Sequence, residues 1–248
     1  MRPSNILPTS TFLIFSLLVA VMLTATIAAA EDGDEEMATT YIEYMAGFSH
    51  VPNQDIKGAS SASILYSGQT EQDAIGYFVG AALGRRLADS DFGTGLGSMR
   101  AEIQIGFRSS EIQSLSVQGE VDNAKGSTVS LFSAMANGYF DFDLGDGEDS
   151  FPVVPWIGAG IGWGMPRLDA QNGATAMQLA VEDTDSVFVY NVMTGITYRI
   201  SKQAELNTGY RYIATTKFKV FGKQSGVRQR FEYNFTAHEL FTGIRFFF

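Results

Sequence analysis

The sequence predicts an all-β protein, an eight-stranded antiparallel up-and-down transmembrane β-barrel. Three observations predict it. Eight segments alternate between apolar and polar side chains with a period of two, which is the repeat of a strand. The connections between these segments alternate between long and short. The apolar side of each segment is almost free of charge and the other side carries charges, as in a barrel whose outer wall faces lipid.

The start of the chain has the features of a secretory signal peptide. Arg2 is the only charge in residues 1–30, an uncharged apolar run follows, and Ala28-Ala29-Ala30 supplies the small residues of a cleavage site. We expect cleavage near Ala30, which leaves 31–248 as the barrel domain. A retained membrane anchor is the alternative, and the acidic stretch directly after the run argues against it.

Composition excludes several functional classes. Removal of residues 1–30 leaves 16 Lys and Arg against 27 Asp and Glu, a formal charge of −11, so there is no electrostatic case for nucleic-acid binding. The chain has no cysteine, hence no disulfide framework and no lipidation site. After the signal peptide, no apolar stretch reaches the 18 or so residues of a membrane helix. Insertion into a membrane therefore requires strands.

The first four strands are expected at about 38–50, 74–84, 99–108 and 129–142. The third is the clearest, because Met99, Ala101, Ile103, Ile105 and Phe107 form an apolar side opposite Arg100, Glu102, Gln104, Gly106 and Arg108. In the fourth, the alternate residues Phe132, Ala134, Ala136, Gly138 and Phe140 face outward, whereas Asn137, Tyr139 and Asp141 face inward. The polar stretches 51–73 and 109–127 are predicted to be long loops.

The last four strands are expected at about 155–165, 186–200, 204–212 and 238–248. A third long loop extends to about Asp185 and a fourth, basic loop precedes the final strand, whereas a tight hairpin joins the sixth and seventh strands. An even number of strands leaves both termini on the side of the short turns. Closure of the eighth strand onto the first removes exposed strand edges.

Five features in this order carry a family resemblance: the signal peptide, YFDF, PWIGAGIGWG, LNTGYRY and the terminal GIRFFF. They resemble the small outer-membrane β-barrel family of opacity and surface-antigen type, which is similar in architecture to the transmembrane domain of outer-membrane protein A. The resemblance implies a monomeric multi-pass barrel in the outer membrane of a Gram-negative type cell envelope. It also implies that the barrel-assembly machinery recognises the apolar side of the last strand, namely Leu240, Thr242, Ile244, Phe246 and Phe248.

Eight charges on the polar side of the strands are expected to face the lumen. Eight strands enclose an interior just wide enough for side chains to fill, and charges out of bulk water persist only in pairs. We therefore interpret the set as a salt-bridge network that fills the lumen, with Arg211 and Glu239 as one pair. A catalytic carboxylate pair or a charged constriction in a pore is the alternative. The set comprises Glu43, Arg100, Glu102, Arg199, Glu205, Arg211, Glu239 and Arg245.

The sequence predicts no catalytic residues, no cofactor and no metal site. The glycines of Gly158–Gly164 recur with a period of two, unlike a nucleotide-binding loop, and are expected to make room in the lumen for bulky side chains. The acidic turn at 141–149 lacks the glycine and the final glutamate of a calcium loop. His50 and His238 have no ligating company in the sequence, and Leu240 replaces the serine that lipid-modifying barrels of this size would carry near His238.

Function is expected to reside in the long connections. The fourth carries five bases, a candidate binding site for lipopolysaccharide or a host polyanion: Lys217, Lys219, Lys223, Arg228 and Arg230. We expect a non-enzymatic protein with a surface-antigen, adhesion or envelope-integrity role, in contact with outer-membrane lipid, the assembly machinery and extracellular ligands. A narrow porin-like channel for ions or small solutes is the alternative. A soluble lipocalin-type barrel would require an apolar lumen and a polar exterior.

Overall fold

The structure is a computed structural model that describes residues 39–59, 65–71, 75–87, 97–117, 120–142, 152–171, 178–180, 186–224 and 227–248. The predicted signal peptide and most of the acidic turn at 141–149 lie outside these residues. The described part of the chain contains no helix that is long and apolar enough to cross a membrane.

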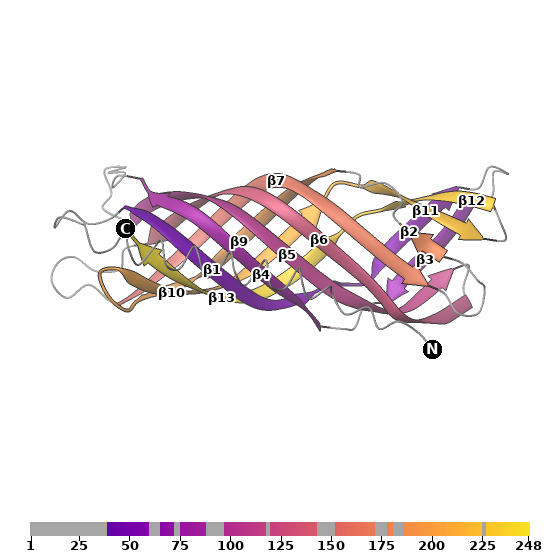
Figure 1. The fold of residues 1–248 in the computed structure, drawn as a ribbon, viewed down its shortest axis with the longest axis horizontal. Helices are drawn as coiled ribbons and strands as arrows, with labels where there is room; N and C mark the ends of the chain where they lie inside the picture. Colours follow the sequence, from indigo (N-terminus) through magenta and orange to yellow (C-terminus); the bar gives the residue numbers. More distant parts are fainter. Residues whose placement is uncertain are drawn as a thin grey trace, which may run out of the picture.

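The described residues form strands joined by short segments (Figure 1). Where side chains are described, burial alternates along each strand with the period of two that the sequence predicts. The strands are β1 (Thr40–His50), β2 (Gln54–Ala59), β3 (Leu65–Glu71), β4 (Ile75–Arg86), β5 (Gly97–Val117), β6 (Glu120–Phe142), β7 (Val153–Gln171), β8 (Gln178–Ala180), β9 (Val187–Arg199), β10 (Ala204–Thr215), β11 (Phe218–Gln224), β12 (Val227–Tyr233) and β13 (Thr236–Phe247).

Eight of these strands close into a barrel, which confirms the predicted fold. Antiparallel pairing runs β1-β4-β5-β6-β7-β9-β10-β13 and returns from β13 to β1. The closure places Glu43 opposite Arg245 and Phe48 opposite Leu240. The Phe248 N–H also donates to the Thr40 carbonyl at 3.0 Å, so the two ends of the barrel sequence meet at one edge. We call this barrel the proximal ring.

A second closed ring continues the wall beyond the proximal ring, at the end opposite the C-terminus (Figure 1). β5, β6 and β7 are long enough to belong to both rings. From β7 the pairing continues through β8, β11, β12, β2 and β3, and β3 returns to β5 at Glu71↔Ser114 to Gly68↔Val117. We call this second ring the distal ring.

The distal ring occupies segments that the sequence predicts to be loops. Because these segments are polar, we predicted loops at 51–73, 109–127 and 165–185 and in the fourth, basic connection. The polar residues there mark the point at which the strands leave the apolar surroundings of the band for water. The strands themselves do not end, because backbone groups still find partners across the hairpin and a strand in water can carry polar side chains. β5 and β6 remain paired to Val117↔Glu120, with one register shift between Ile112 and Ser114.

The outward face of the proximal ring is an apolar band. Phe48 is 68% exposed, Ile103 69% and Leu240 63%, fractions that no water-soluble barrel would maintain around its whole wall. Among the described side chains of the proximal ring, outward-facing charges lie only at the two edges of this band, with Glu111 and Arg167 at the distal edge and Arg85 at the other. The band thus has the polarity of a lipid-facing wall.

Candidate functional site

The interior of the proximal ring is packed with charged side chains. Those described include five carboxylates and five guanidinium groups: Glu43, Glu102, Asp141, Glu205 and Glu239 with Arg86, Arg100, Arg108, Arg211 and Arg245. Nine of the ten are buried, and the Arg86 side chain retains 28% exposure near the C-terminal edge. We call this set the ion-pair network. Its charge balance lets the interior stay neutral without counter-ions.

Arg245 is the main link near the C-terminal edge. Its Nη2 lies 2.8 Å from Oε2 of Glu43, and its Nη1 lies 2.8 Å from Oε2 of Glu205. Asn207 donates to the second oxygen of Glu43 at 2.7 Å, and Arg86 pairs with the second oxygen of Glu205. One cation therefore bridges two carboxylates, and each carboxylate has a further donor. Such full satisfaction is what makes buried ion pairs tolerable.

Three more ion pairs belong to the network. Arg100 Nε lies 2.8 Å from Oδ2 of Asp141. Toward the distal end, Glu239 accepts from Arg108 Nε at 2.6 Å and from Arg211 Nη1 at 3.3 Å. The structure therefore places Arg211 beside Glu239, and Arg108 is a second cation on the same carboxylate.

Glu102 is held by neutral donors. The hydroxyl of Tyr41 donates to its Oε2 at 3.2 Å, and Asn137 Nδ2 donates to its Oε1 at 3.1 Å. The Tyr139 hydroxyl also donates to Oε1. Asn137 in turn accepts from Asn191 at 3.1 Å, so the amide and phenol groups extend the network across four strands.

Each of the five guanidinium groups also lies over an aromatic ring. The Arg100 Cζ is 4.0 Å from the Tyr139 ring centroid, and Arg211 lies 4.7 Å from Phe78 and 4.8 Å from Phe241. The remaining stacked pairs are Arg86 on Phe247, Arg108 on Phe78 and Arg245 on Tyr41. A planar guanidinium combines an ion pair along its edge with stacking on its face, which lysine does not do. Every cation of the ion-pair network among the described residues is an arginine.

Three members of the network are absent from the predicted set. Arg108 and Asp141 lie on strand faces that the sequence pattern assigns to the lumen, so the alternation of the strands could have placed both in the network. Arg86 lies beyond the predicted end of its strand and was assigned to a connection, whereas β4 continues to it. Arg199 is the register partner of Glu205 but is only half-buried and forms none of the ion pairs found among the described residues.

Glycines on β7 leave space for side chains of β6. A Cβ at Gly158 would lie 2.5 Å from the Tyr139 ring, and one at Gly164 would lie 2.9 Å from Leu131. Glycines of β9 and β10 similarly accommodate Trp156, whose ring would be 2.5 Å from a Cβ at Gly195 and 2.7 Å from one at Gly209. The period-two glycine run is therefore a packing feature of the lumen.

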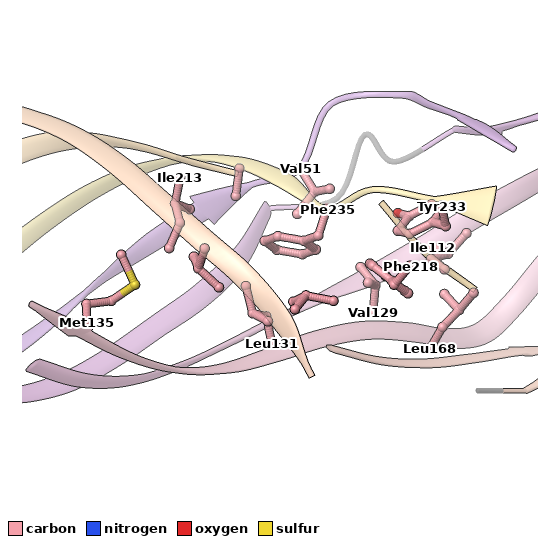
Figure 2. Packing of buried hydrophobic residues seen from close by; sticks show 13 residues of the cluster. Val51, Ile112, Val129, Leu131, Met135, Leu168, Ile213, Phe218, Tyr233 and Phe235 are labelled. Atoms are coloured by element: carbon pink, nitrogen blue, oxygen red, sulfur yellow. The ribbon is translucent and has the colours of Figure 1, made fainter. Parts of the chain in front are cut away.

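An apolar layer closes the distal end of the proximal ring (Figure 2). Its side chains come from β5, β6, β7 and β9 to β13 and from the segments that join the two rings. The Ile213, Phe235 and Leu131 side chains are each at most 1% exposed. The sequence did not predict this layer, because several of its residues, such as Ile112, Leu168 and Phe218, lie in segments that were expected to be loops. It comprises Val51, Ile112, Val129, Leu131, Met135, Leu168, Val187, Val189, Ile213, Phe218, Tyr233, Phe235 and Ala237.

A match to a known protein family agrees with the fold and the apolar band. The family model of the outer membrane protein beta-barrel domain matches residues 15–246. The chain belongs to this family. It is therefore an outer-membrane β-barrel, as the sequence resemblance implied. Among solved structures, the outer membrane protein OprG from Pseudomonas aeruginosa is 13% identical with a TM-score of 0.51, covering 86% of this chain and 98% of that one.

The chain is also similar to other proteins. Neisserial surface protein A is 20% identical, with a TM-score of 0.45 over 84% of this chain and 97% of its own. Uncharacterized proteins of Brucella abortus (strain 2308) and Brucella suis biovar 1 (strain 1330) are each 28% identical over 114 residues, which is 44% of this chain. The match spans 37% of the length of these curated relatives.

The basic positions of the fourth connection lie on or beside the paired strands β11 and β12. Phe218 and Tyr233 are paired and buried, so the next pair, Lys219 and Glu232, is exposed on the outer face. The register pairs position 221 with 230. Lys217, which is also exposed, lies 4.0 Å from Glu232. Lys223 is the direct partner of Arg228.

The apolar side of β13 faces outward along its whole length. Leu240, Thr242, Ile244 and Phe248 are exposed and Phe246 is half-exposed. Interior positions alternate with them and belong to the lumen. The residues expected to form an assembly signal therefore form one continuous stripe at the closure of the barrel.

Proposed function

We propose that this protein is a non-conducting, non-enzymatic outer-membrane scaffold whose distal ring projects from the cell surface and presents a basic face to polyanions. The observation that carries the proposal is the filled interior. Interior side chains are buried from Arg245 at one end to the apolar layer at the other. An ion crosses a barrel only where water or polar protein groups surround it. A conducting path here would therefore require breaks in both the ion-pair network and the apolar layer.

Planar-bilayer recording tests the filled interior against the alternative of a narrow porin-like channel. Purified protein, checked for folding by heat-modifiable gel mobility, is expected to produce no channel events at any voltage that the bilayer tolerates. Steady small openings that persist in independently refolded samples would overturn the non-conducting assignment. A channel-forming porin added to the same bilayer serves as the positive control.

The orientation of the distal ring follows from where the polar strands lie. They continue the wall past the apolar band, on the side opposite the short turns and the C-terminus, and in outer-membrane barrels the longer connections face the exterior. Fractionation combined with protease treatment of intact cells tests this. Cleavage is expected between residues 217 and 230, with the proximal ring protected.

The basic face of β11 and β12 is proposed to bind anionic sugars or the phosphates of lipopolysaccharide. Two bases, Lys223 and Arg228, are direct cross-strand partners, an arrangement that costs free energy until an anion lies against it. β2 adds Lys57, the register partner of Glu232. The chain as a whole is negatively charged, so attraction to a polyanion would be confined to this local basic surface.

Charge reversal tests the polyanion site. The four substitutions Lys219→Glu, Lys223→Glu, Arg228→Glu and Arg230→Glu are expected to weaken salt-dependent binding to heparin and to lipopolysaccharide at least about tenfold, since each base near an anionic surface contributes about 1 kcal/mol. Lys202→Glu, at the exposed turn on the opposite end, is the matched control. Equal binding by the quadruple variant and the control would refute the site.

The outward stripe of β13 is proposed to be the signal that the assembly machinery reads. Deletion of Phe248 is expected to lower the yield of assembled barrel in cells while leaving heparin binding by the purified fraction unchanged. Normal yield after the deletion would argue against this role. Substitution of outward Ile200, which is 55% exposed at a turn of the same edge, by Ala controls for general loss of apolar surface.

A further inference from the structure

Closure of the barrel brings the two histidines of the sequence together. The 248 residues contain His50 and His238 and no other histidine. They lie near opposite ends of the mature chain, yet β1 and β13 pair them directly, residue against residue. Their ring centroids are 6.5 Å apart, with 35° between the ring planes. Neither was predicted to have a ligating partner, because only the register of the closure supplies one.

Both imidazoles lie on the outer surface, at the distal edge of the apolar band. His50 has the parity of exposed Phe48, and His238 has that of exposed Leu240. His50 is exposed and His238 is half-buried. The register neighbours that flank the pair are Ile75 on one side and Tyr212 on the other, both uncharged. Water and small solutes therefore reach the pair, and a cation there would meet no adjacent lysine or arginine in this row.

A third side chain orients one of the rings. The Tyr210 oxygen lies 2.6 Å from His238 Nδ1. In the tautomer in which Nδ1–H donates to that oxygen, Nε2 keeps its lone pair and is free to bind a metal. Histidine ligands in metal sites characteristically donate the other ring N–H in this way, which fixes the tautomer and the ring direction.

We propose that His50 and His238 form a two-histidine site for a divalent transition-metal ion such as Cu²⁺, Ni²⁺ or Zn²⁺, with Tyr210 as the positioning residue. Imidazole nitrogens suit these ions. Two imidazoles on one tetrahedral ion place their centroids about 5 Å apart when each metal–nitrogen bond is about 2.0 Å. The two ring centroids would have to approach each other by roughly 1 to 2 Å, and rotation of the exposed His50 side chain supplies this.

Water would complete the coordination. Among the described residues no group of three or more His, Cys, Asp or Glu side chains is placed to hold a metal ion, so this part of the chain contributes the histidine pair alone. The site is consequently one of moderate affinity that responds to metal supply. Its location matters more than its strength, because a bound ion joins the first strand of the barrel to the last at the closing seam.

The test uses the untagged mature chain, folded in a neutral detergent, with Cu²⁺ as the probe. Titration is expected to give one bound ion per chain with a spectrum of two nitrogen ligands in electron paramagnetic resonance. His50→Gln and His238→Gln are each expected to weaken binding on the order of 100-fold, because the second ligand acts as an intramolecular chelator. Tyr210→Phe is expected to weaken it about tenfold through loss of ring orientation.

Tyr77→Phe is the matched control, since Tyr77 is an exposed tyrosine on β4 and the register partner of Phe48. It is expected to bind Cu²⁺ as the unchanged chain does. Heat-modifiable mobility verifies that each variant is folded, and both histidines lie on the surface, where substitution leaves the interior intact. Equal affinity in the unchanged chain and the two single histidine variants, or a spectrum with one nitrogen ligand, would overturn the proposal.

A second readout addresses the seam. Zn²⁺ is expected to raise the midpoint of thermal unfolding of the unchanged chain, because an ion that binds only the folded state stabilises it. The single histidine variants are expected to show no such rise. A rise of equal size in the variants would mean that Zn²⁺ acts elsewhere and would also overturn the proposal.

Discussion

The ion-pair network and the apolar layer fill the same barrel with opposite chemistry. In the network each buried guanidinium group is held by a carboxylate and an aromatic ring, and losing one partner leaves a buried charge. In the apolar layer each side chain is held by several interchangeable neighbours. The network therefore depends on particular pairs, and the layer depends on volume. This difference predicts that single substitutions cost most where they leave a charge unpaired.

The largest effect is expected for Arg245→Ala. The substitution leaves Glu43 without its cation and removes one of the two cations of Glu205. Breaking a buried pair in this way typically costs about 3–5 kcal/mol, so we expect a loss of about 4 kcal/mol in the free energy of unfolding. Urea titration of the chain in detergent micelles measures it. A loss below about 1 kcal/mol would mean that water solvates this part of the lumen.

A smaller loss is expected for Leu131→Ala in the apolar layer. Leu131 is fully buried, and truncation of such a leucine costs about 3 kcal/mol through lost transfer energy and the cavity left behind. Leu131→Met, which conserves volume, is the matched control and should cost less than about 1.5 kcal/mol. Leu131→Ala should also remain silent in planar bilayers, because the ion-pair network still blocks the path. Channel events in this variant would show that the layer alone seals the barrel.

The fold was predictable to a greater extent than the pairings within it. The period of two gave the correct face for every proximal-ring strand, since lipid outside and a packed lumen inside impose opposite chemistry on alternate residues. The Arg211–Glu239 contact follows from adjacent strands and parity. The bridging of Glu43 and Glu205 by Arg245 depends on the register of two seams, β1 with β13 and β10 with β13, and local sequence does not specify it.

The distal ring marks where prediction from the sequence ended. Its closing contact joins β3 to β5, and β8 contributes only the three residues Gln178–Ala180. Polar residues without an apolar side give no clear periodicity, so strands in these segments were not distinguishable from loops. The pairing of His50 with His238 was hidden for a related reason. Closure of the barrel was expected, but a shift of the seam by one residue would have separated the pair.

An intermediate effect is expected for Glu102→Gln. Its partners Tyr41, Tyr139 and Asn137 are neutral donors, so the substitution leaves no buried cation unpaired. The cost is the rearrangement of hydrogen bonds around an amide that offers one acceptor oxygen in place of two, about 1–2 kcal/mol. Glu239→Gln is the informative comparison, because it leaves Arg108 and Arg211 without a carboxylate and should cost about 4 kcal/mol. Equal losses in the two variants would contradict the importance of charge pairing.

The smallest effect is expected at the exposed Lys217–Glu232 pair on the distal ring. The Lys217 side chain is 71% exposed and that of Glu232 58%, with nitrogen and oxygen 4.0 Å apart. Exposed pairs contribute at most about 1 kcal/mol, because water screens the charges and ordering two long side chains costs entropy. A double-mutant cycle with Lys217→Ala and Glu232→Ala should therefore give a coupling below about 0.5 kcal/mol, whereas the same cycle on Arg245 and Glu43 should exceed 2 kcal/mol. The two cycles thus compare an exposed pair at 4.0 Å with a buried pair at 2.8 Å. A coupling of similar size in the two would mean that the interior charges are solvated like surface charges, and the filled lumen and the silent bilayer would both be wrong.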